Sequence, residues 1–394
     1  MAAPRVRERH FPIGARVDLG GLAASPYGIL AELREHEPVS WVPSLNMWFV
    51  TRRDDVIDVL KDTDTFTTDS PDSTIRDTFG PQMLSADGET QQRFRAPCNP
   101  MFRPAAVLET FGPEIETRAH ALIEGLDARG EAELRTEFAG RLAVQVVALA
   151  LGLPAEDELR IRAWYNDFAA ALANFEWRSD VREQGRRSAR EFCEYASTLA
   201  GIVPNGSLLR AMASANSGLS EDEALGNALI VLFGGIETTE SMISNALWAL
   251  LTHPEQLQQI RNDLTLLDNA VEETLRWEPA VQTCTRHATR STAIRGVPVA
   301  EGDTVQCMIG AVNRDPDHFE SPEVFDILRT NARDHFAFGY GKHFCLGAHL
   351  ARLETRVALK KMMEKWPSMR LDVARSTAPY GYEFRKPNGL WVEW

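Results

Sequence analysis

Cysteine is scarce in this chain, and its arrangement excludes several kinds of site. The 394 residues contain five cysteines, at positions 98, 193, 284, 307 and 345, and no Cys-x-x-Cys pair. An odd number of widely spaced cysteines argues against a disulfide framework and against a cysteine-rich zinc site. Each cysteine is expected first to be a small buried apolar residue, because free cysteine usually packs inside.

A long apolar run is also missing. The longest one, residues 228–236, ends at Glu237, whereas a membrane-spanning helix needs roughly 20 apolar residues. The first 20 residues contain no apolar run of the kind found in a secretory signal. We therefore expect a cytoplasmic protein with no membrane partner, with residues 1–20 forming an extended N-terminal arm.

Basic charge is not in excess. The chain has 42 Lys and Arg against 56 Asp and Glu, which gives a formal net charge of −14. Nucleic-acid-binding domains normally carry a basic patch or stripe, so nucleic acid is not an expected partner. Hydrophobic residues make up 44% of the chain, which is typical of a globular protein and too much for a disordered one.

Domain boundaries are not visible in the sequence. A length of 394 residues suggests two or three domains, but no repeat, low-complexity linker or Pro-rich and Gly-rich run divides the chain. Helical patterns dominate, and strands are expected within residues 39–51, on both sides of a turn at residues 300–303 within residues 292–308, and around residues 382–394. The predicted fold class is mainly α with a minor β region, built as one domain over residues 1–394.

A long helix is predicted over residues 220–252. Ser220 and Glu223 have the spacing of a capping box at its start. Its middle reads LFGGIETTES, although each glycine there destabilises a helix by about 1 kcal/mol relative to alanine. Two interpretations stay open: a tight helix crossing at the glycines, or a helix opened beside a ligand with Glu237 and Thr238 as the chemical pair.

A second helix, residues 269–277, places Glu273 and Arg276 three residues apart on one face. Such a pair is usually a solvated surface contact worth a few tenths of a kcal/mol, at most about 1 kcal/mol. Alone, it indicates no chemistry.

A third helix is predicted after Cys345, behind a glycine-containing loop that reads FGYGKHFCLG over residues 338–347. A helix N-terminus offers unpaired N–H groups and a positive dipole end, which favour a thiolate. Glycines allow the backbone to approach a flat ligand, so the segment suits a thiolate ligand to a large planar metal cofactor. A buried structural cysteine and a nucleophilic cysteine with His343 as base are the alternatives.

Residues 338–347 match the haem-binding signature of the cytochromes P450, which is Phe-Gly-x-Gly-x-His-x-Cys-x-Gly. Three further segments resemble other motifs of that family, in family order: residues 235–239 the oxygen-binding groove, residues 273–276 the Glu-x-x-Arg pair, and residues 325–329 the meander. The resemblance extends over about residues 26–394. It implies the family fold, a single triangular domain that is mainly helical with a small β region.

The resemblance also implies a haem b cofactor and assigns residues to it. Cys345 would be the axial thiolate and the metal ligand, which favours O–O cleavage. Cationic partners are expected for the two haem propionates. The implied cofactor-binding residues are Cys345, His343, Arg286, Arg95, Gln91, Phe338, Gly339, Gly347 and Gly235. Gln91 stands where the family usually has a histidine four residues before the arginine, so its contact to a propionate lacks a charge.

The implied function is a haem-thiolate monooxygenase that activates O2 and hydroxylates or otherwise oxidises a small, largely apolar substrate. Glu237 and Thr238 match the family's acid–alcohol pair, which relays protons during oxygen activation. Glu273, Arg276 and Arg329 would form a buried structural network. The alternatives are a peroxide-driven or oxidative-coupling enzyme and a non-catalytic haem-thiolate sensor; an intact proton relay argues against the sensor.

Electrons would come from a separate donor, because no flavin or iron–sulfur segment is present. A ferredoxin with its reductase, or a flavodoxin, is the expected partner of a monomeric enzyme. Arg93, Arg103 and Lys342 are expected to form a local basic patch for it. By analogy with the family, the substrate pocket is expected along residues 66–84, 168–177, 230–234 and 280–283, with a tip near residues 380–382.

Overall fold

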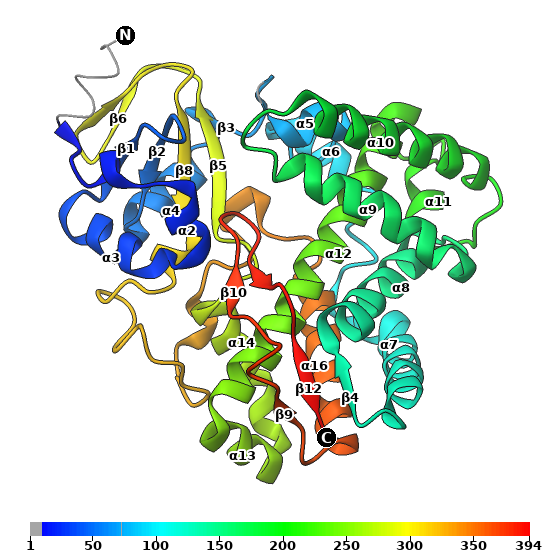
Figure 1. Cartoon of the computed structure of the whole chain (residues 1–394). Coiled ribbons are helices and arrows are strands. Elements are labelled where there is room, and N and C mark those ends of the chain that lie inside the picture. Colours follow the sequence, from blue (N-terminus) through cyan, green and yellow to red (C-terminus); the bar gives the residue numbers. More distant parts are fainter. Residues whose placement is uncertain (1–9, 72) are drawn as a thin grey trace.

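One helix, α12 (Glu221–Thr252), runs through the middle of the molecule and organises the fold (Figure 1). The computed structural model describes residues 10–71 and 73–394. The side chain of Ser220 accepts from the backbone N–H of Glu223, whose own side chain accepts from Ser220, so the predicted capping box is present. At about 1.5 Å per residue the helix is long enough to cross a whole domain.

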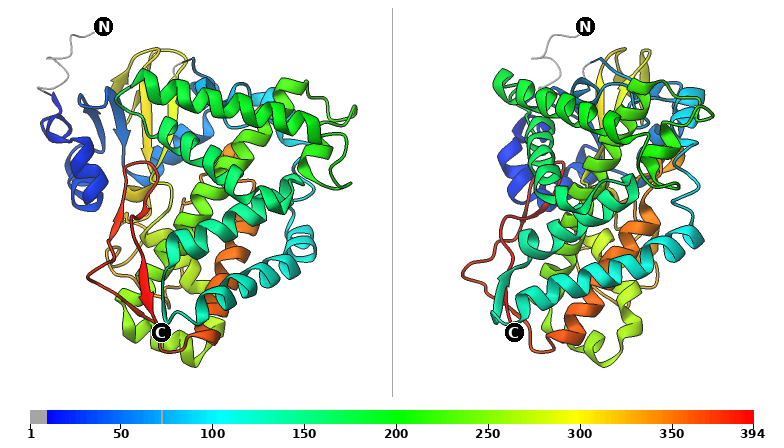
Figure 2. Two further views of the ribbon diagram at one scale, coloured as in Figure 1. Left: turned by 45° about the vertical axis from the view of Figure 1, so that its right-hand side comes forward. Right: turned by 90° about the vertical axis from the view of Figure 1, so that its right-hand side faces the viewer.

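Most of the helices pack around α12 and form the larger part of the molecule, while the larger sheet lies on one side together with the N-terminal helices (Figures 1 and 2). Figure 1 shows a triangular outline, broad at the top and narrow near the C-terminus. The remaining helices are α2 (Leu19–Ala24), α3 (Pro26–His36), α4 (Arg53–Lys61), α5 (Thr74–Phe79), α6 (Gly88–Arg95), α7 (Pro104–Asp127), α8 (Gly140–Leu151), α9 (Glu158–Leu172), α10 (Ser179–Leu199), α11 (Leu208–Met212), α13 (Pro254–Asn262), α14 (Leu267–Trp277), α15 (Ile309–Val312) and α16 (Ala348–Lys365). The predicted mainly α class with a minor β region is confirmed.

The strands form one larger sheet and three small ones. They are β1 (Val39–Val42), β2 (Met47–Val50), β3 (Phe66–Thr67), β4 (Glu131–Glu133), β5 (Thr283–Ala288), β6 (Thr292–Ile294), β7 (Val297–Val299), β8 (Thr304–Met308), β9 (Arg370–Leu371), β10 (Pro379–Tyr380), β11 (Lys386–Pro387) and β12 (Trp391–Glu393). The larger sheet has the order β1-β2-β8-β5-β3, with β2 and β8 parallel. The small sheets pair β10 with β11, β6 with β7, and β12 with both β4 and β9.

The larger sheet has two faces with different cores, because side chains alternate along a strand. One face, here called the inner face, carries Cys307. Its apolar core also includes Phe336, which lies next to the Cys345 loop, and Cys284 packs against this core. The other face carries Phe49 and Met308, which pack with Tyr382. Residues of β5 on the inner face therefore point toward the side of the sheet where Cys345 lies.

Three sequence predictions need correction in detail. Residues 10–20 are not an extended arm: Gly14–Arg16 is a 3-10 turn held by Glu37, which accepts from the N–H groups of Ile13 and Gly14 at 2.8 and 3.0 Å. Residues 1–9 of the expected arm lie outside the described residues. The expected strand at 39–51 is divided by a tight turn at Asn46, and the first strand expected within 292–308 is divided at Arg295-Gly296, because these residues adopt positive φ. The turn expected at residues 300–303 is present between β7 and β8.

In the part of the chain that the structure describes, no helix is long and apolar enough to cross a membrane.

Candidate active site around Cys345 and the middle of α12

The loop before α16 fixes the backbone around Cys345. Gly339 and Gly341 both have φ of 73°, a conformation that glycine adopts without strain. A side chain on Gly341 would also lie 3.2 Å from the carbonyl oxygen of Leu60. The N–H of Cys345 donates to the carbonyl of Phe338 at 2.9 Å, which closes the loop. The predicted role of the glycines in a tight turn is confirmed.

The Cys345 thiol lies in an unusual environment. Its surface is accessible, yet burial by the surrounding protein raises its pKa. A thiol can be both accessible and surrounded by protein when it faces a space enclosed by the fold. A hydrogen bond from the backbone N–H of Gly347 and the charges of Arg95 and Arg352 act in the opposite direction and favour the thiolate. A coordinated metal ion would deprotonate such a thiol outright.

A metal at Cys345 would have to bring most of its own ligands. Among residues 10–71 and 73–394, no group of three or more His, Cys, Asp or Glu side chains could hold a metal ion. A cofactor whose macrocycle supplies the other ligands meets this requirement. The chain borders open space at Gly347 and at Gly234 of α12, because a Cβ built on either residue would have no atom within 4 Å apart from its chain neighbours and the backbone of its own helix.

Arg286 on β5 provides a direct test of fit for an anionic cofactor. Its side chain is buried, its Nη1 donates to the carbonyl of Thr285 at 2.8 Å, and its Nε finds no hydrogen-bond partner in the structure as described. An unpaired donor on a buried cation is unfavourable, since the lost hydration is not replaced. The inner face of the sheet therefore offers a site for a carboxylate such as a haem propionate.

Gln91 and Arg95 on α6 hold the cysteine loop from outside. Gln91 is buried and its Nε2 donates to the carbonyl of Lys342 at 3.0 Å. Arg95 donates from Nη1 to the carbonyl of Phe344 at 2.9 Å. Both residues were expected at the cofactor, and the structure shows both donating to backbone carbonyls of the cysteine loop.

His343 has a partner that the sequence did not reveal. Its Nε2 lies 2.8 Å from Oδ1 of Asp87, the residue before α6. Burial alone would raise the pKa of Asp87, but hydrogen bonds from His343, from Thr67 and from the N–H of Thr68 hold it below its usual value. Since Nε2 is engaged with Asp87, a contact between His343 and a propionate would have to use Nδ1.

The two glycines of α12 have different surroundings. A Cβ on Gly235 would lie 2.9 Å from Cγ2 of Val147 on α8, so this glycine permits a close helix crossing. Gly234 instead borders open space, and its carbonyl accepts a hydrogen bond from Oγ1 of Thr238 at 2.5 Å. The helix-crossing interpretation therefore applies to Gly235, although Gly235 was expected to contact the cofactor. The side of the helix that borders open space is formed by Gly234 and Thr238.

Glu237 is the centre of a buried charged network that the sequence missed. Lys386 of β11 places Nζ 2.8 Å from Oε1 of Glu237, and the hydroxyl of Tyr165 on α9 donates to Oε2. Lys386 also donates to the Tyr165 hydroxyl at 2.9 Å and lies 3.3 Å from Oε1 of Glu240. Burial and the charge of Glu237 raise the pKa of Tyr165, so its proton stays on the hydroxyl.

The network extends from Glu237 toward solvent. Arg135 places Nη1 2.9 Å from Oε1 of Glu240, and its side chain is 24% exposed against 3% for Glu240. Chain segments separated by up to 250 residues thus form one line of hydrogen-bonding groups. A guanidinium does not give up a proton in a protein, so the groups of this line that can exchange protons are the Lys386 amine and the carboxylates of Glu240 and Glu237.

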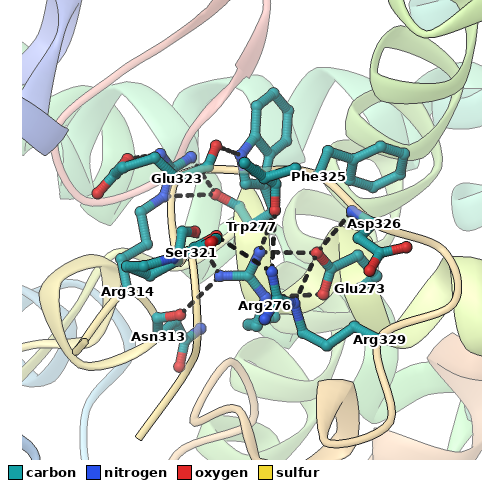
Figure 3. A network of polar contacts seen from close by, with 12 residues as sticks. Glu273, Arg276, Trp277, Asn313, Arg314, Ser321, Glu323, Phe325, Asp326 and Arg329 are labelled. Atoms are coloured by element: carbon teal, nitrogen blue, oxygen red, sulfur yellow. Dashed lines mark hydrogen bonds and ion pairs between the residues drawn. The ribbon is translucent and has the colours of Figure 1, made fainter. Parts of the chain in front are cut away.

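A second buried network stabilises the side of the fold that carries Cys345 (Figure 3). Arg276 forms two hydrogen bonds of 2.7 Å with Glu273, and neither side chain is exposed. Arg329 donates to the same carboxylate at 3.2 Å, and the N–H of Asp326 does so at 2.9 Å. The surface interpretation of the Glu273–Arg276 pair is therefore wrong, and the family-based expectation of a buried network of Glu273, Arg276 and Arg329 is confirmed.

Glu272, next to this network, connects α14 to the cysteine loop. Arg352 of α16 binds its carboxylate at 2.7 Å and lies over the Phe338 ring at 4.4 Å. His335 binds the other oxygen of Glu272 at 3.0 Å. Burial alone would raise the pKa of Glu272, but His335 and Arg352 lower it to about 2. This carboxylate is therefore charged at neutral pH and holds both ends of the Cys345 loop.

Comparisons with known proteins agree with this geometry. A family model described as "Cytochrome P450" matches residues 205–369. The chain is 34% identical to cytochrome P450 monooxygenase PikC of Streptomyces venezuelae, over 91% of this chain and 89% of the relative. It is 33% identical to the mycinamicin IV hydroxylase/epoxidase of Micromonospora griseorubida, over 96% and 97%.

A solved structure is similar throughout. The crystal structure of P450BioI in complex with an acyl carrier protein ligated with hexadec-9Z-enoic acid superimposes with a TM-score of 0.86 at 30% sequence identity. The match covers 94% of this chain and 98% of that chain.

Proposed function

This chain belongs to the cytochrome P450 family and is a haem-iron oxidoreductase of the monooxygenase class, and we propose that it uses two electrons from an external redox partner. They serve to activate O2 and to hydroxylate or otherwise oxidise a small, largely apolar organic substrate. The accessible Cys345 thiol inside the fold carries this proposal.

The proposed cofactor is haem b, held by residues of three regions. Cys345 would supply a thiolate ligand to the iron, Arg286 would bind a propionate through its free Nε, and Gly234 and Gly347 would leave room for the macrocycle. When bound, haem supplies oxygen activation, and its thiolate ligand favours O–O cleavage. The reduced, carbon-monoxide-bound spectrum tests the proposal, because the Soret band is strongly red-shifted only with thiolate ligation. An unshifted band would overturn it.

Glu237 and Thr238 would handle protons on the α12 side. The Thr238 hydroxyl donates to the Gly234 carbonyl at 2.5 Å and so keeps its lone pairs toward the open side of the helix. Glu237 would pass protons to this hydroxyl or to water held by it, and it would be resupplied through the Lys386 ammonium, which contacts both Glu237 and Glu240 and is 18% exposed. Arg135 would hold Glu240 in place. Lys386 and Tyr165 hold the Glu237 carboxylate in place during this exchange.

Replacing Thr238 with alanine is expected to uncouple electron use from product formation. NAD(P)H consumption should continue while the yield of product per NAD(P)H falls about tenfold or more, because loss of one positioned proton-transfer group typically lowers the rate of its step by 10²–10⁴-fold. The measurement is the ratio of product to NAD(P)H. Ser244→Ala is the matched control, since Ser244 makes the same kind of bond to the carbonyl four residues back, at 2.7 Å. Unchanged coupling in Thr238→Ala would refute the relay.

The proposed electron donor is a ferredoxin with its reductase, or a flavodoxin, docking on the outer side of the cysteine loop. Phe344, next to Cys345, is 45% exposed there. The basic patch expected from Arg93, Arg103 and Lys342 needs revision, because Arg93 is neutralised by two hydrogen bonds of 2.6 and 2.7 Å to Glu223.

A shallow pocket of about 250 Å³ beside the start of α7 is the better candidate for this docking site. It is lined by Pro104, Val107, Leu108, Asp268, Val271, Glu272, Arg333, His349, Arg352, Leu353 and Arg356. Within the described ranges, no carboxylate pairs with Arg333 or with the neighbouring Arg103. An acidic donor can therefore dock on these two exposed cations.

Neutralising Arg103 and Arg333 together, each to glutamine, is expected to raise the KM for the donor protein several-fold and to weaken its dependence on salt, because charge attraction mainly accelerates encounter. Steady-state reduction assays at two salt concentrations measure both effects. Arg93→Gln serves as control and should leave the donor KM nearly unchanged. An unchanged KM in the double variant would refute the docking site.

Substrate, location and assembly complete the proposal. Aromatic rings contributed by α5, α9, α12 and the C-terminal hairpin contact one another near Gly234: Phe79 with Phe168 at 5.1 Å, and Phe233 with Phe384 at 5.4 Å. These rings favour a largely apolar substrate.

All five cysteines are free, as expected for a reducing compartment, and we propose a cytoplasmic monomer built as one domain.

A further inference from the structure

Glu383 lies in the turn between β10 and β11 and is fixed against the segment that leads into β5. Its carbonyl accepts from the N–H of Gln282 at 2.9 Å, and the N–H of Arg385 donates to the carbonyl of Ala280 at 2.9 Å. Phe384 forms a bridge pair with Val281. The turn therefore has a defined position relative to the inner face of the sheet.

The Glu383 side chain lies on the same side as the proposed cofactor residues. Tyr382, the residue before it, packs on the opposite face of the sheet with Phe49. Glu383 is close enough to Cys284 for its charge to raise the pKa of that thiol. Cys284 and Arg286 share one face of β5, so Glu383 faces the space that Arg286 borders.

The carboxylate of Glu383 has no partner. In the described part of the chain no side chain donates a hydrogen bond to it, although it keeps partly accessible surface. Burial by the surrounding protein raises its pKa to about 7. Whether this carboxyl group is protonated or charged therefore depends on the ligand that lies next to it.

Two of the nearby cations are engaged elsewhere. Lys386 binds Glu237 at 2.8 Å and Glu240 at 3.3 Å. Arg385 is buried and binds Glu278 at 2.7 Å as well as the carbonyl of Ala23. The charge of Arg286 lowers the pKa of Cys284, and the free Nε of Arg286 is available to a propionate.

We propose that Glu383 binds a protonated amine of the substrate, so that the natural substrate is a largely apolar molecule carrying a basic nitrogen. The inference rests on the proposed function and identifies a class of substrate for it. A desolvated carboxylate favours a cation strongly and repels an anion, because charge-assisted hydrogen bonds are strongest where water is excluded. Apolar ligands without the amine would leave the carboxylate unpaired.

The test compares two series of imidazoles that differ only at one end. One series carries n-alkyl chains of increasing length, and the other carries the same chains ending in a primary amine. The imidazole ring would bind the haem iron and shift the Soret band, which gives a dissociation constant for each ligand. The substitution Glu383→Gln removes the charge at nearly constant shape.

In the wild-type enzyme, at least one aminoalkyl ligand is expected to bind about tenfold tighter than the alkyl ligand of similar length. In Glu383→Gln this preference should disappear, while the affinity for the alkyl series should stay within about twofold. Glu301→Gln, a change on an exposed turn, should keep the wild-type preference. A red-shifted carbon-monoxide band in every variant shows that the site is intact.

The outcomes separate this inference from the proposed function. If no imidazole shifts the Soret band of the wild-type enzyme, the haem site itself is wrong. If both series bind but the wild-type enzyme shows no preference for the amine at any chain length, the role of Glu383 is refuted. An amine preference that persists in Glu383→Gln refutes it as well.

Discussion

Replacing Cys345 with serine is expected to remove monooxygenase activity and the strongly red-shifted carbon-monoxide band together. A hydroxyl has nearly the size of the thiol, and the loop is closed by backbone atoms, since the N–H of Cys345 donates to the carbonyl of Phe338 at 2.9 Å. The fold should therefore survive. Loss of a residue that only supports a metal ligand typically costs 10–100-fold, so loss of the ligand itself should lower activity by more than about a hundredfold.

The matched control is Cys284→Ala. Cys284 is also partly accessible and also faces the inner side of the sheet, so a nonspecific effect of losing a thiol near the cofactor would show there too. Spectra and turnover of this variant should resemble the wild type. A Cys345→Ser protein that keeps both the red-shifted band and its activity would exclude Cys345 as the ligand.

The part of the site that was predicted from the sequence depends on contacts between near neighbours. The capping box of Ser220 and Glu223 marks the start of α12 to the residue. The glycines at 339 and 341 predict a tight turn, and the structure has φ of 73° at both. Local sequence suffices in such cases because the interacting groups lie within a few residues of each other.

The partners of Glu237 could not be predicted in the same way. Tyr165 and Lys386 are 221 residues apart in the chain, yet their side chains are 2.9 Å apart beside α12. Neither residue belongs to a motif, and a lysine near the C-terminus is expected to be solvated. Only the packing of α9 and β11 against α12 brings them to the carboxylate.

The glycines of α12 show a third kind of limit. Helical periodicity indicates that Gly234 and Gly235 lie on adjoining parts of the helix surface, but not which of them meets a neighbouring helix. The structure places Val147 against Gly235 and open space beside Gly234. The rotation of the helix is set by tertiary packing, so a motif can identify the site and still assign the contact to the wrong neighbour.

Replacing Glu273 with alanine is expected to prevent normal folding and haem loading. The carboxylate accepts two bonds of 2.7 Å from Arg276 and further bonds from Arg329 and the N–H of Asp326. Its removal leaves two buried cations without their anion, which typically destabilises a protein by about 3–5 kcal/mol. That is a large fraction of a typical stability of about 5–15 kcal/mol. Haem content per protein and the denaturant midpoint measure the effect.

A carboxylate at the surface separates this network from ordinary surface charge. Glu323 pairs with Arg314 close to the same network, and its side chain is 55% exposed, whereas that of Arg314 is 6% exposed. Arg314 also donates to the carbonyl of Trp277, and a glutamine at position 323 keeps an oxygen that can accept from it. Glu323→Gln should therefore load haem fully and unfold close to the wild-type midpoint. The segment that supplies Arg329 and Asp326 leads into the Cys345 loop, so the Glu273 carboxylate stabilises the backbone on which the thiolate depends. A Glu273→Ala protein that folds and loads haem like Glu323→Gln would show that the loop holds its shape without this network.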